Sequence, residues 1–135
     1  VSLEDNIETD EVIELYKANR WSSAEKPELL IPALKNSDSL VTARISGKLV
    51  GISNAISDGC LVVYYPHMLV HPDYQGLGLG KLMLHTAMLN ARMQGLHSMT
   101  LGTETEMRAY HLYRKNGFEV LDGAILFEKG FRKRN

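Results

Sequence analysis

A glycine-rich segment is the first feature of this sequence whose residue types and spacing could do chemistry. Three of the eleven glycines in the 135 residues lie within five positions, at Gly76, Gly78 and Gly80. The segment stands between an apolar stretch typical of a strand and a stretch with helical periodicity. A glycine-rich turn that opens a helix directs free backbone N–H groups and the positive end of the helix dipole at one point. It therefore predicts an anion site, with phosphate as the first candidate; glycines that serve only a tight turn are the alternative.

Counting residues excludes two familiar phosphate-binding loops. A Walker loop needs a glycine where this sequence has Gln75, and Ser or Thr where it has Leu82 after Lys81. A dinucleotide-binding fingerprint fails because its third glycine would fall at Lys81 or Met83. The pattern that remains is Gln-x-x-Gly-x-Gly.

A strand and a helix must position this loop. The strand over residues 60–70 consists of two apolar halves separated by Pro66, which cannot donate a ladder hydrogen bond. We therefore expect that strand to be bent, bulged or unpaired on one side near its middle. The helix after the loop ends near Gly95, and its predicted buried face follows a spacing of three and four at Leu79, Leu82, Met83, Thr86, Ala87, Asn90 and Ala91.

The length of 135 residues predicts one domain over residues 1–135, and the order of its other elements is that of a mixed α+β protein. Helices are predicted from Thr9 to about Asn19, over 26–35 with Pro32 inside, and over 107–116 with Gly117 as C-cap. Strands are predicted as a hairpin of 40–45 and 49–56, as 98–102, and as a last hairpin of 118–120 and 124–127, with a short first strand before all of them.

Composition excludes several classes of function. Fifteen Lys and Arg against sixteen Asp and Glu give a formal net charge of -1, so we expect neither nucleic acid nor an anionic membrane as a partner. The sequence shows no membrane-spanning apolar run and no signal peptide at its start, which predicts a cytoplasmic protein. Cys60 is the only cysteine, so neither a disulfide framework nor a cysteine-based metal cluster is expected, and we predict no metal site.

Two blocks in the right order resemble one family. The block Leu69-Val70-His71-Pro72-Asp73-Tyr74-Gln75-Gly76-Leu77-Gly78-Leu79-Gly80 resembles the acetyl-coenzyme A (acetyl-CoA) motif of the GNAT (Gcn5-related) N-acetyltransferases. The block Ala109-Tyr110-His111-Leu112-Tyr113-Arg114-Lys115-Asn116-Gly117-Phe118 matches the family pattern Ala-x-x-x-Tyr-x-x-x-Gly-Phe. The resemblance implies a mostly antiparallel, twisted central sheet, splayed between its fourth and fifth strands and flanked by helices. It also implies a single N-acetyltransferase domain.

The resemblance further implies where acetyl-CoA binds as the co-substrate. The pantetheine arm would lie along Met68, Leu69 and Val70, with the thioester carbonyl near a backbone N–H at Leu69. The pyrophosphate would lie on the amides of Gln75, Gly76, Leu77, Gly78, Leu79, Gly80 and Lys81. One position departs from the family pattern: Glu106 stands where many members have Asn, so that contact does not carry over, and Thr103 or Thr105 is the nearest substitute.

The resemblance also suggests how the acetyl group would move. Tyr113 matches the tyrosine that protonates the departing thiolate, and Tyr110 is the alternative three residues earlier. His67, just upstream of the thioester site, is the candidate general base. The alternatives, which could relay a proton through water, are Asp58, Glu104 and Glu106. No base is needed if the amine loses its proton to solvent. Cys60 raises a covalent mechanism through an acetyl-thiol, but direct transfer in a ternary complex is favoured, because odd spacing points Cys60 and His67 to opposite faces unless a bulge intervenes.

The predicted partners are acetyl-CoA and an amine acceptor. Trp21, Tyr64, Tyr65 and Met68 could line an apolar acceptor pocket, which favours a small primary amine. A peptide or protein amine is the alternative acceptor, and a non-catalytic acyl-CoA sensor is the alternative class of function. The oligomeric state stays open between a monomer and a homodimer.

Overall fold

The computed structural model describes residues 1–4, 6–102, 108–121, 123 and 127–131. Contacts within the chain divide it into two compact units, Val1–Gly102 and Thr103–Asn135, and each unit is described by itself. The single domain over 1–135 stays a prediction.

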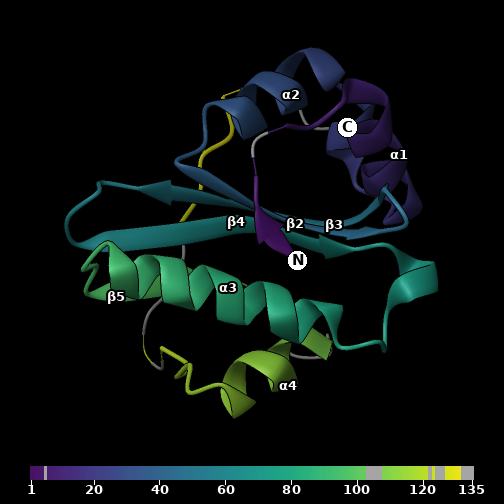
Figure 1. Cartoon of the computed structure of the whole chain (residues 1–135). Helices are drawn as coiled ribbons and strands as arrows, with labels where there is room; N and C mark the ends of the chain where they lie inside the picture. Colours follow the sequence, from purple (N-terminus) through teal and green to yellow (C-terminus); the bar gives the residue numbers. More distant parts are fainter. Residues whose placement is uncertain (5, 103–107, 122, 124–126, 132–135) are drawn as a thin grey trace. The chain divides into compact units, whose positions relative to one another are not determined.

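The first unit is built on a five-stranded sheet with the order β1-β2-β3-β4-β5 (Figure 1). Every neighbouring pair is antiparallel except β4 and β5, which run parallel. This arrangement confirms the predicted α+β class with a mostly antiparallel sheet. The strands are β1 (Ser2–Leu3), β2 (Ser39–Ile45), β3 (Lys48–Ser57), β4 (Val62–Val70) and β5 (Ser98–Leu101).

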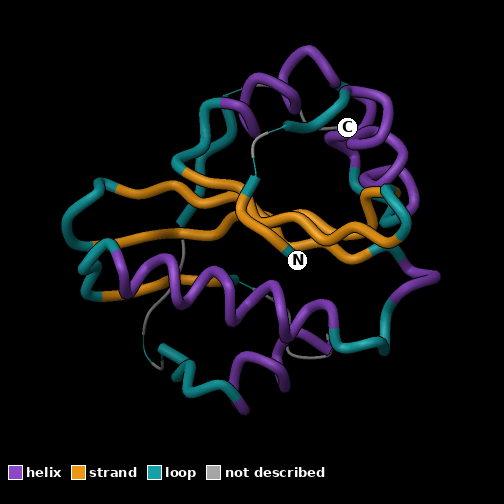
Figure 2. Tube along the Cα trace, in the orientation of Figure 1, coloured by secondary structure: helices purple, strands orange, loops and turns teal. Residues whose placement is uncertain are grey.

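Helices cover both faces of this sheet (Figures 1 and 2). α1 (Thr9–Ala18), the 3₁₀ turn η1 (Ser22–Glu25) and α2 (Pro27–Lys35) cover one face, and α3 (Leu79–Met93) covers the other. Each face has its own core: Leu15, Leu34 and Ile52 are buried under α1 and α2, whereas Val50 and Met83 are buried under α3. The amphipathic helices therefore bury their apolar sides against a sheet that is apolar on both faces.

Pro66 causes the predicted irregularity of β4. Asn54 of β3 pairs with His67 of β4, and Ile56 pairs with Tyr64. Between these two pairs β3 has one residue and β4 has two, Tyr65 and Pro66, so β4 contains a bulge. The parallel pairing with β5 covers Val62 to Tyr65 and stops before the proline. The predicted bulge near the middle of this strand is confirmed.

The bulge reverses which side chains of β4 face which helices. Before it, Val63 and Tyr65 belong to the core under α3; after it, Leu69 belongs to the core under α1 and α2. His67, two residues before Leu69, therefore projects toward α1 and η1.

The helix predicted over 26–35 with Pro32 inside it is present as α2, from Pro27 to Lys35. Two other sequence predictions need correction. The predicted face of α3 is rotated: Leu82 is 52% exposed, and Leu84, which was not predicted, is fully buried. The predicted last hairpin is wrong in its first half, because residues 118–120 form no strand, and residues 124–126 lie outside the described residues.

Gly51 lets α3 approach the sheet closely. A Cβ at this position would lie 2.7 Å from the Met83 Sδ and 3.1 Å from the Ala43 Cβ, both of them in buried residues.

We expect Gly51→Ala to lower the free energy of unfolding by about 1–3 kcal/mol, because the core cannot yield without shifting Met83. Urea denaturation measures this change. Gly102→Ala is the matched control, since a Cβ there meets nothing within 4 Å; equal losses in both variants would contradict the packing role of Gly51.

Arg44 of β2 binds α1 and the residue that follows β1. Its guanidinium contacts the carboxylate of Glu4 at 2.8 Å and both carboxylate oxygens of Glu11 at 2.8 Å, and it also donates to the Gly47 carbonyl at 3.1 Å. The hydrogen bonds from Arg44 hold the pKa of Glu11 below its ordinary value. A lowered folded-state pKa means that this stabilisation is present above the ordinary carboxyl pKa and is lost as the pH falls through the folded pKa.

Glu11→Gln should therefore be less stable than the wild type at neutral pH, and the difference should shrink toward about pH 3. Urea denaturation across this range measures it. Glu14→Gln, at an exposed position of the same helix, should show no such trend. A difference between Glu11→Gln and the wild type that does not change with pH would contradict the assignment.

Candidate functional site

The segment between β4 and α3 is fastened to the end of the sheet. The His71 amide donates to the Val50 carbonyl at 2.7 Å, and the 3₁₀ turn η2 (Pro72–Tyr74) follows. The Gln75 side-chain amide donates to the Val70 carbonyl at 3.0 Å, and its backbone amide approaches the Pro72 carbonyl at 3.4 Å. Gln75 thus anchors the start of the glycine loop to the last residue of β4.

The loop then presents amides at the start of α3. Gly76 and Gly78 have φ of +86° and +83°, a conformation that glycine adopts without strain. The first hydrogen bond of the helix runs from the Leu82 amide to the Gly78 carbonyl at 3.1 Å, so the amides of the three preceding residues point out of the helix N-terminus. The first turn contains no acidic residue, and the space beside Gly78 is open. This geometry suits a phosphate anion.

The end of β4 leads directly into this loop. Met68, Leu69 and Val70 pair with Ser53, Ile52 and Gly51 of β3. The registered pairing with β5 has already stopped at Tyr65, so this end of β4 lies beyond the part held between two strands. The three strand residues predicted to hold the pantetheine and the loop predicted to hold the pyrophosphate are therefore contiguous in space.

His67 lies in an aromatic cluster on the α1 side of β4. Its Nδ1 is 2.9 Å from the Tyr16 hydroxyl oxygen. The Trp21 ring meets the imidazole edge to face, with ring centroids 5.0 Å apart and an interplanar angle of 87°. Burial lowers the pKa of His67, so the ring is neutral at neutral pH. Sequence reasoning named His67 and Trp21 but missed Tyr16, which is 51 positions from His67.

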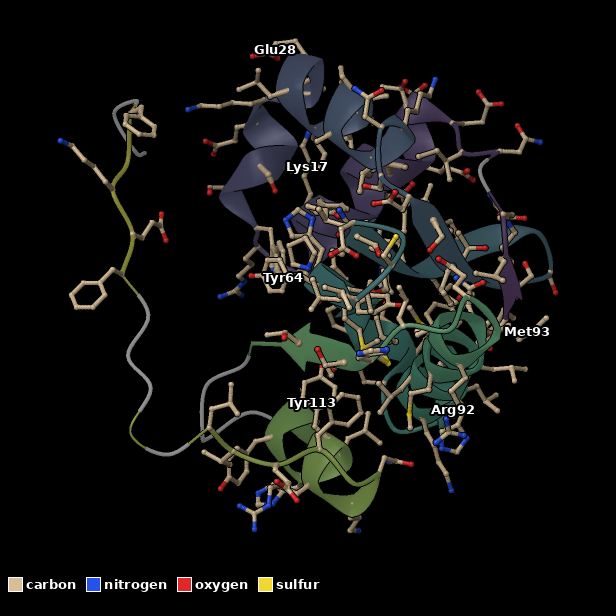
Figure 3. The ribbon with its side chains drawn as sticks, turned by 90° about the vertical axis from the view of Figure 1, so that its left-hand side faces the viewer. Lys17, Glu28, Tyr64, Arg92, Met93 and Tyr113 are labelled. Atoms are coloured by element: carbon tan, nitrogen blue, oxygen red, sulfur yellow. The ribbon has the colours of Figure 1, made fainter. Side chains whose placement is uncertain are left out.

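The four apolar residues predicted to line one acceptor pocket do not share one surface. Tyr65 faces α3 and donates its hydroxyl to the Ala87 carbonyl at 3.3 Å, and Met68 packs against the same core. Tyr64 is 46% exposed and projects on the side of the sheet that carries α1 and its Lys17 (Figure 3). Trp21 packs against the core on that side. The pleat of β4 separates Tyr65 from Tyr64, so Trp21 and Tyr64 are the members that share a side.

Cys60 lies in the turn before β4 and is exposed. The Asp58 carboxylate accepts the amides of Cys60 at 2.8 Å and of Leu61 at 2.7 Å, which keeps Cys60 out of the strand. These backbone hydrogen bonds lower the pKa of Asp58. Because β4 has a bulge, the odd spacing of Cys60 and His67 does not place them on opposite faces; the turn, rather than the spacing, determines where Cys60 lies.

The second unit contains α4 (Arg108–Lys115), which carries both candidate phenols. Tyr113 is 8% exposed, its ring packs against Phe118 at a centroid distance of 5.8 Å, and its carbonyl accepts the Phe118 amide at 3.1 Å (Figure 3). Burial raises the pKa of Tyr113, which keeps it protonated. Tyr110 accepts a hydrogen bond from Arg114 at 3.3 Å instead. Thr103, Glu104, Thr105 and Glu106 lie outside the described residues.

Among the described residues, no group of three or more His, Cys, Asp or Glu side chains could hold a metal ion. No helix in that part of the chain is long and apolar enough to cross a membrane.

Comparisons with known proteins agree with this geometry. Residues 36–120 match the family described as "Acetyltransferase (GNAT) domain". The chain is 32% identical over 117 residues to the "Uncharacterized N-acetyltransferase ycf52" of Pyropia yezoensis, and this match covers 84% of the chain and 66% of that protein. It therefore spans just under two thirds of the length of that relative.

Two further similarities are informative. The chain is 44% identical over 52 residues to the "L-amino acid N-acyltransferase MnaT" of Escherichia coli (strain K12), which covers 38% of the chain and 30% of that protein. The solved structure of the GNAT family acetyltransferase SP0256 from Streptococcus pneumoniae TIGR4 superimposes with a TM-score of 0.82 at 25% identity, covering 97% of each chain.

Proposed function

This chain belongs to the GNAT acetyltransferase family, and from that premise we propose that it transfers an acetyl group from acetyl-CoA directly to the primary amine of a small molecule. The observation that carries the proposal is the junction of β4 and α3. There the end of a strand, which pairs within the described residues with β3 alone, leads into a loop whose amides converge at a helix N-terminus. One extended ligand with a pyrophosphate at one end and an amide-rich arm matches this junction.

Different residues of the junction bind different parts of acetyl-CoA. The amides from Gly76 to Lys81 receive the pyrophosphate, since they precede the first helical hydrogen bond and carry the positive end of the dipole. The Gln75 side chain holds the loop against Val70. The backbone amide of Gln75 contributes less to binding the pyrophosphate, because it already faces the Pro72 carbonyl. The backbone of Met68, Leu69 and Val70 binds the pantetheine arm.

The transfer itself needs a neutral amine and a proton for the leaving group. The neutral amine nitrogen bonds to the thioester carbon, the C–S bond breaks, and the nitrogen releases one proton. The thiolate takes a proton from a positioned acid, so that the products are an amide and a free thiol. Tyr113 supplies that proton, because burial keeps its phenol neutral and a phenol matches a thiolate in basicity. His67 lies on the acceptor side of the thioester; to act there as a base, it would need an unprotonated ring nitrogen facing the amine.

A small primary amine is the acceptor that the observations favour. The similarity to an L-amino acid N-acyltransferase supports this class, and the net charge of -1 offers no strong attraction for a large charged partner. A peptide or protein amine is the second candidate. A non-catalytic sensor would need no proton donor at Tyr113, where packing against Phe118 would be the residue's whole role.

Direct transfer predicts the kinetic pattern. Amine and acetyl-CoA must occupy the enzyme together, so initial-rate plots at varied concentrations of both substrates should intersect. Cys60→Ala should retain most of the activity, because the exposed turn thiol takes no part. Parallel plots, with an acetyl-enzyme that forms before the amine is added and is missing from Cys60→Ala, would contradict direct transfer.

A further inference from the structure

We propose that Tyr16 fixes the tautomer of His67: the Tyr16 hydroxyl donates to Nδ1, and the proton of the neutral imidazole resides on Nε2. Tyr16 is then a positioning residue, and His67 offers a ligand a hydrogen-bond donor instead of a base. The inference rests on the proposed function only for the identity of the ligand that meets Nε2.

Among the described residues, Nδ1 of His67 is the one partner that can take the hydrogen of the Tyr16 hydroxyl. Tyr16 has no exposed surface, and its oxygen is 2.9 Å from Nδ1 of His67, its hydrogen-bond partner in the described part of the chain. Burial raises the pKa of Tyr16, so the hydroxyl keeps its proton. If Nδ1 carried a proton instead, it would donate to the tyrosine oxygen and leave the hydroxyl hydrogen buried without an acceptor. An unmet buried donor is strongly disfavoured, which selects the tautomer with the proton on Nε2.

The surroundings of His67 prevent the ring from exchanging its two nitrogens. The Trp21 ring lies edge to face at 5.0 Å and the Tyr16 ring at 5.6 Å. The backbone is held on the strand, since the His67 amide donates to the Asn54 side chain at 3.2 Å and its carbonyl accepts from the Ser53 hydroxyl at 2.8 Å. Nε2 makes no hydrogen bond within the described residues, so it is the nitrogen left for a ligand.

This tautomer changes the chemistry that His67 can do. An Nε2 that already carries a proton has no free lone pair, so it cannot accept another from an ammonium or an attacking amine. The ring would first have to move its proton to Nδ1, which would break the hydrogen bond from Tyr16. The same N–H can donate to an oxygen of the bound acyl donor or acceptor, and Leu69, beside which the thioester is placed, is two residues away on the same face of β4. The amine then loses its proton to solvent rather than to His67.

The tautomer can be measured without any substrate. In 15N-labelled protein at neutral pH, long-range 1H–15N correlations should show His67 protonated on Nε2 and unprotonated on Nδ1. In Tyr16→Phe, which loses only the hydroxyl, the two nitrogen signals should move toward the average of both tautomers. Tyr65→Phe is the matched control, since it removes another buried tyrosine hydroxyl, bonded to the Ala87 carbonyl, and should leave the His67 signals unchanged.

A proton on Nδ1 in the wild type would overturn the inference, and so would His67 signals that are the same in Tyr16→Phe and the wild type. The wild-type spectrum decides the question even if Tyr16→Phe does not fold. A protein without acetyl-transfer activity would contradict the proposed function and leave the tautomer result standing.

Kinetics test the donor role separately. His67→Gln keeps a side-chain N–H donor but has no basicity, whereas His67→Ala has neither. We expect His67→Gln to retain about tenfold more kcat/KM than His67→Ala, the value of one hydrogen bond. Equal losses in the two variants would show that a hydrogen-bond donor at this position is not what the reaction needs.

Discussion

Tyr113→Phe is expected to lower kcat by about 10²–10⁴-fold while the affinity for acetyl-CoA stays unchanged. The substitution removes a hydroxyl and keeps the ring that packs against Phe118, so the fold should be retained. Without a positioned acid, the thiolate must leave unprotonated, and the loss should appear at the chemical step. Single-turnover measurements of CoA release, together with calorimetry of acetyl-CoA binding, separate these two quantities.

Tyr110→Phe is the matched control, because it removes a phenol one helical turn earlier that is engaged with Arg114. It should keep nearly full activity. Because burial raises the pKa of Tyr113, the wild-type rate should not fall through ionisation of this phenol until the pH exceeds 10. Full kcat in Tyr113→Phe, at a rate limited by chemistry, would assign the proton to another group, and a large loss in Tyr110→Phe would identify the neighbouring phenol.

Gly78→Glu is expected to abolish CoA binding. A carboxylate at this position would stand at the helix N-terminus where the pyrophosphate is placed, and like charges brought together cost several kcal/mol, a loss of at least about 100-fold in affinity. Isothermal titration calorimetry with CoA measures it. A Cβ at Gly78 would meet nothing within 4 Å, so the new side chain starts in open space.

Gly78→Ala separates charge from backbone strain. Gly78 has a φ of +83°, a conformation that any other residue adopts only with strain, and this strain is common to both variants. If the loop binds the pyrophosphate, Ala should weaken CoA binding much less than Glu. Equal affinities for CoA in Gly78→Glu and the wild type, with both proteins folded, would contradict the assignment of the loop.

Local patterns explain which parts of this fold the sequence could predict. The glycine loop, the break at Pro66 and the alternating strands are set by residues within a few positions of one another, where sterics and periodicity act directly. The phase of α3 was predicted less well, since Leu82 and Leu84 are equally apolar and only the sheet beneath the helix decides which is buried. The start of β4 was misplaced because the carboxylate of Asp58 captures the following amides.

The candidate site likewise has a part that local sequence patterns predict and a part that depends on the rest of the fold. The loop and the end of β4 are adjacent in sequence, so their contiguity could be predicted. The contact between Tyr16 and His67 joins α1 to β4, and no local signal marks it, because Tyr16 occupies an ordinary apolar position of an amphipathic helix. The bulge at Pro66 determines that His67 faces this helix. The side of β4 on which His67 lies could be predicted only with the position of the bulge known.

The most direct test of the central claim is a paired assay of both products. The purified protein is incubated with acetyl-CoA and single amines, namely L-amino acids, other small primary amines and lysine-containing peptides; released thiol and acetylated amine are both quantified. The account predicts equal amounts of CoA and N-acetyl product, formed only when protein and a small amine are both present. Tight binding of acetyl-CoA without amine-dependent thiol release for any of these acceptors would contradict it and would identify an acyl-CoA sensor instead.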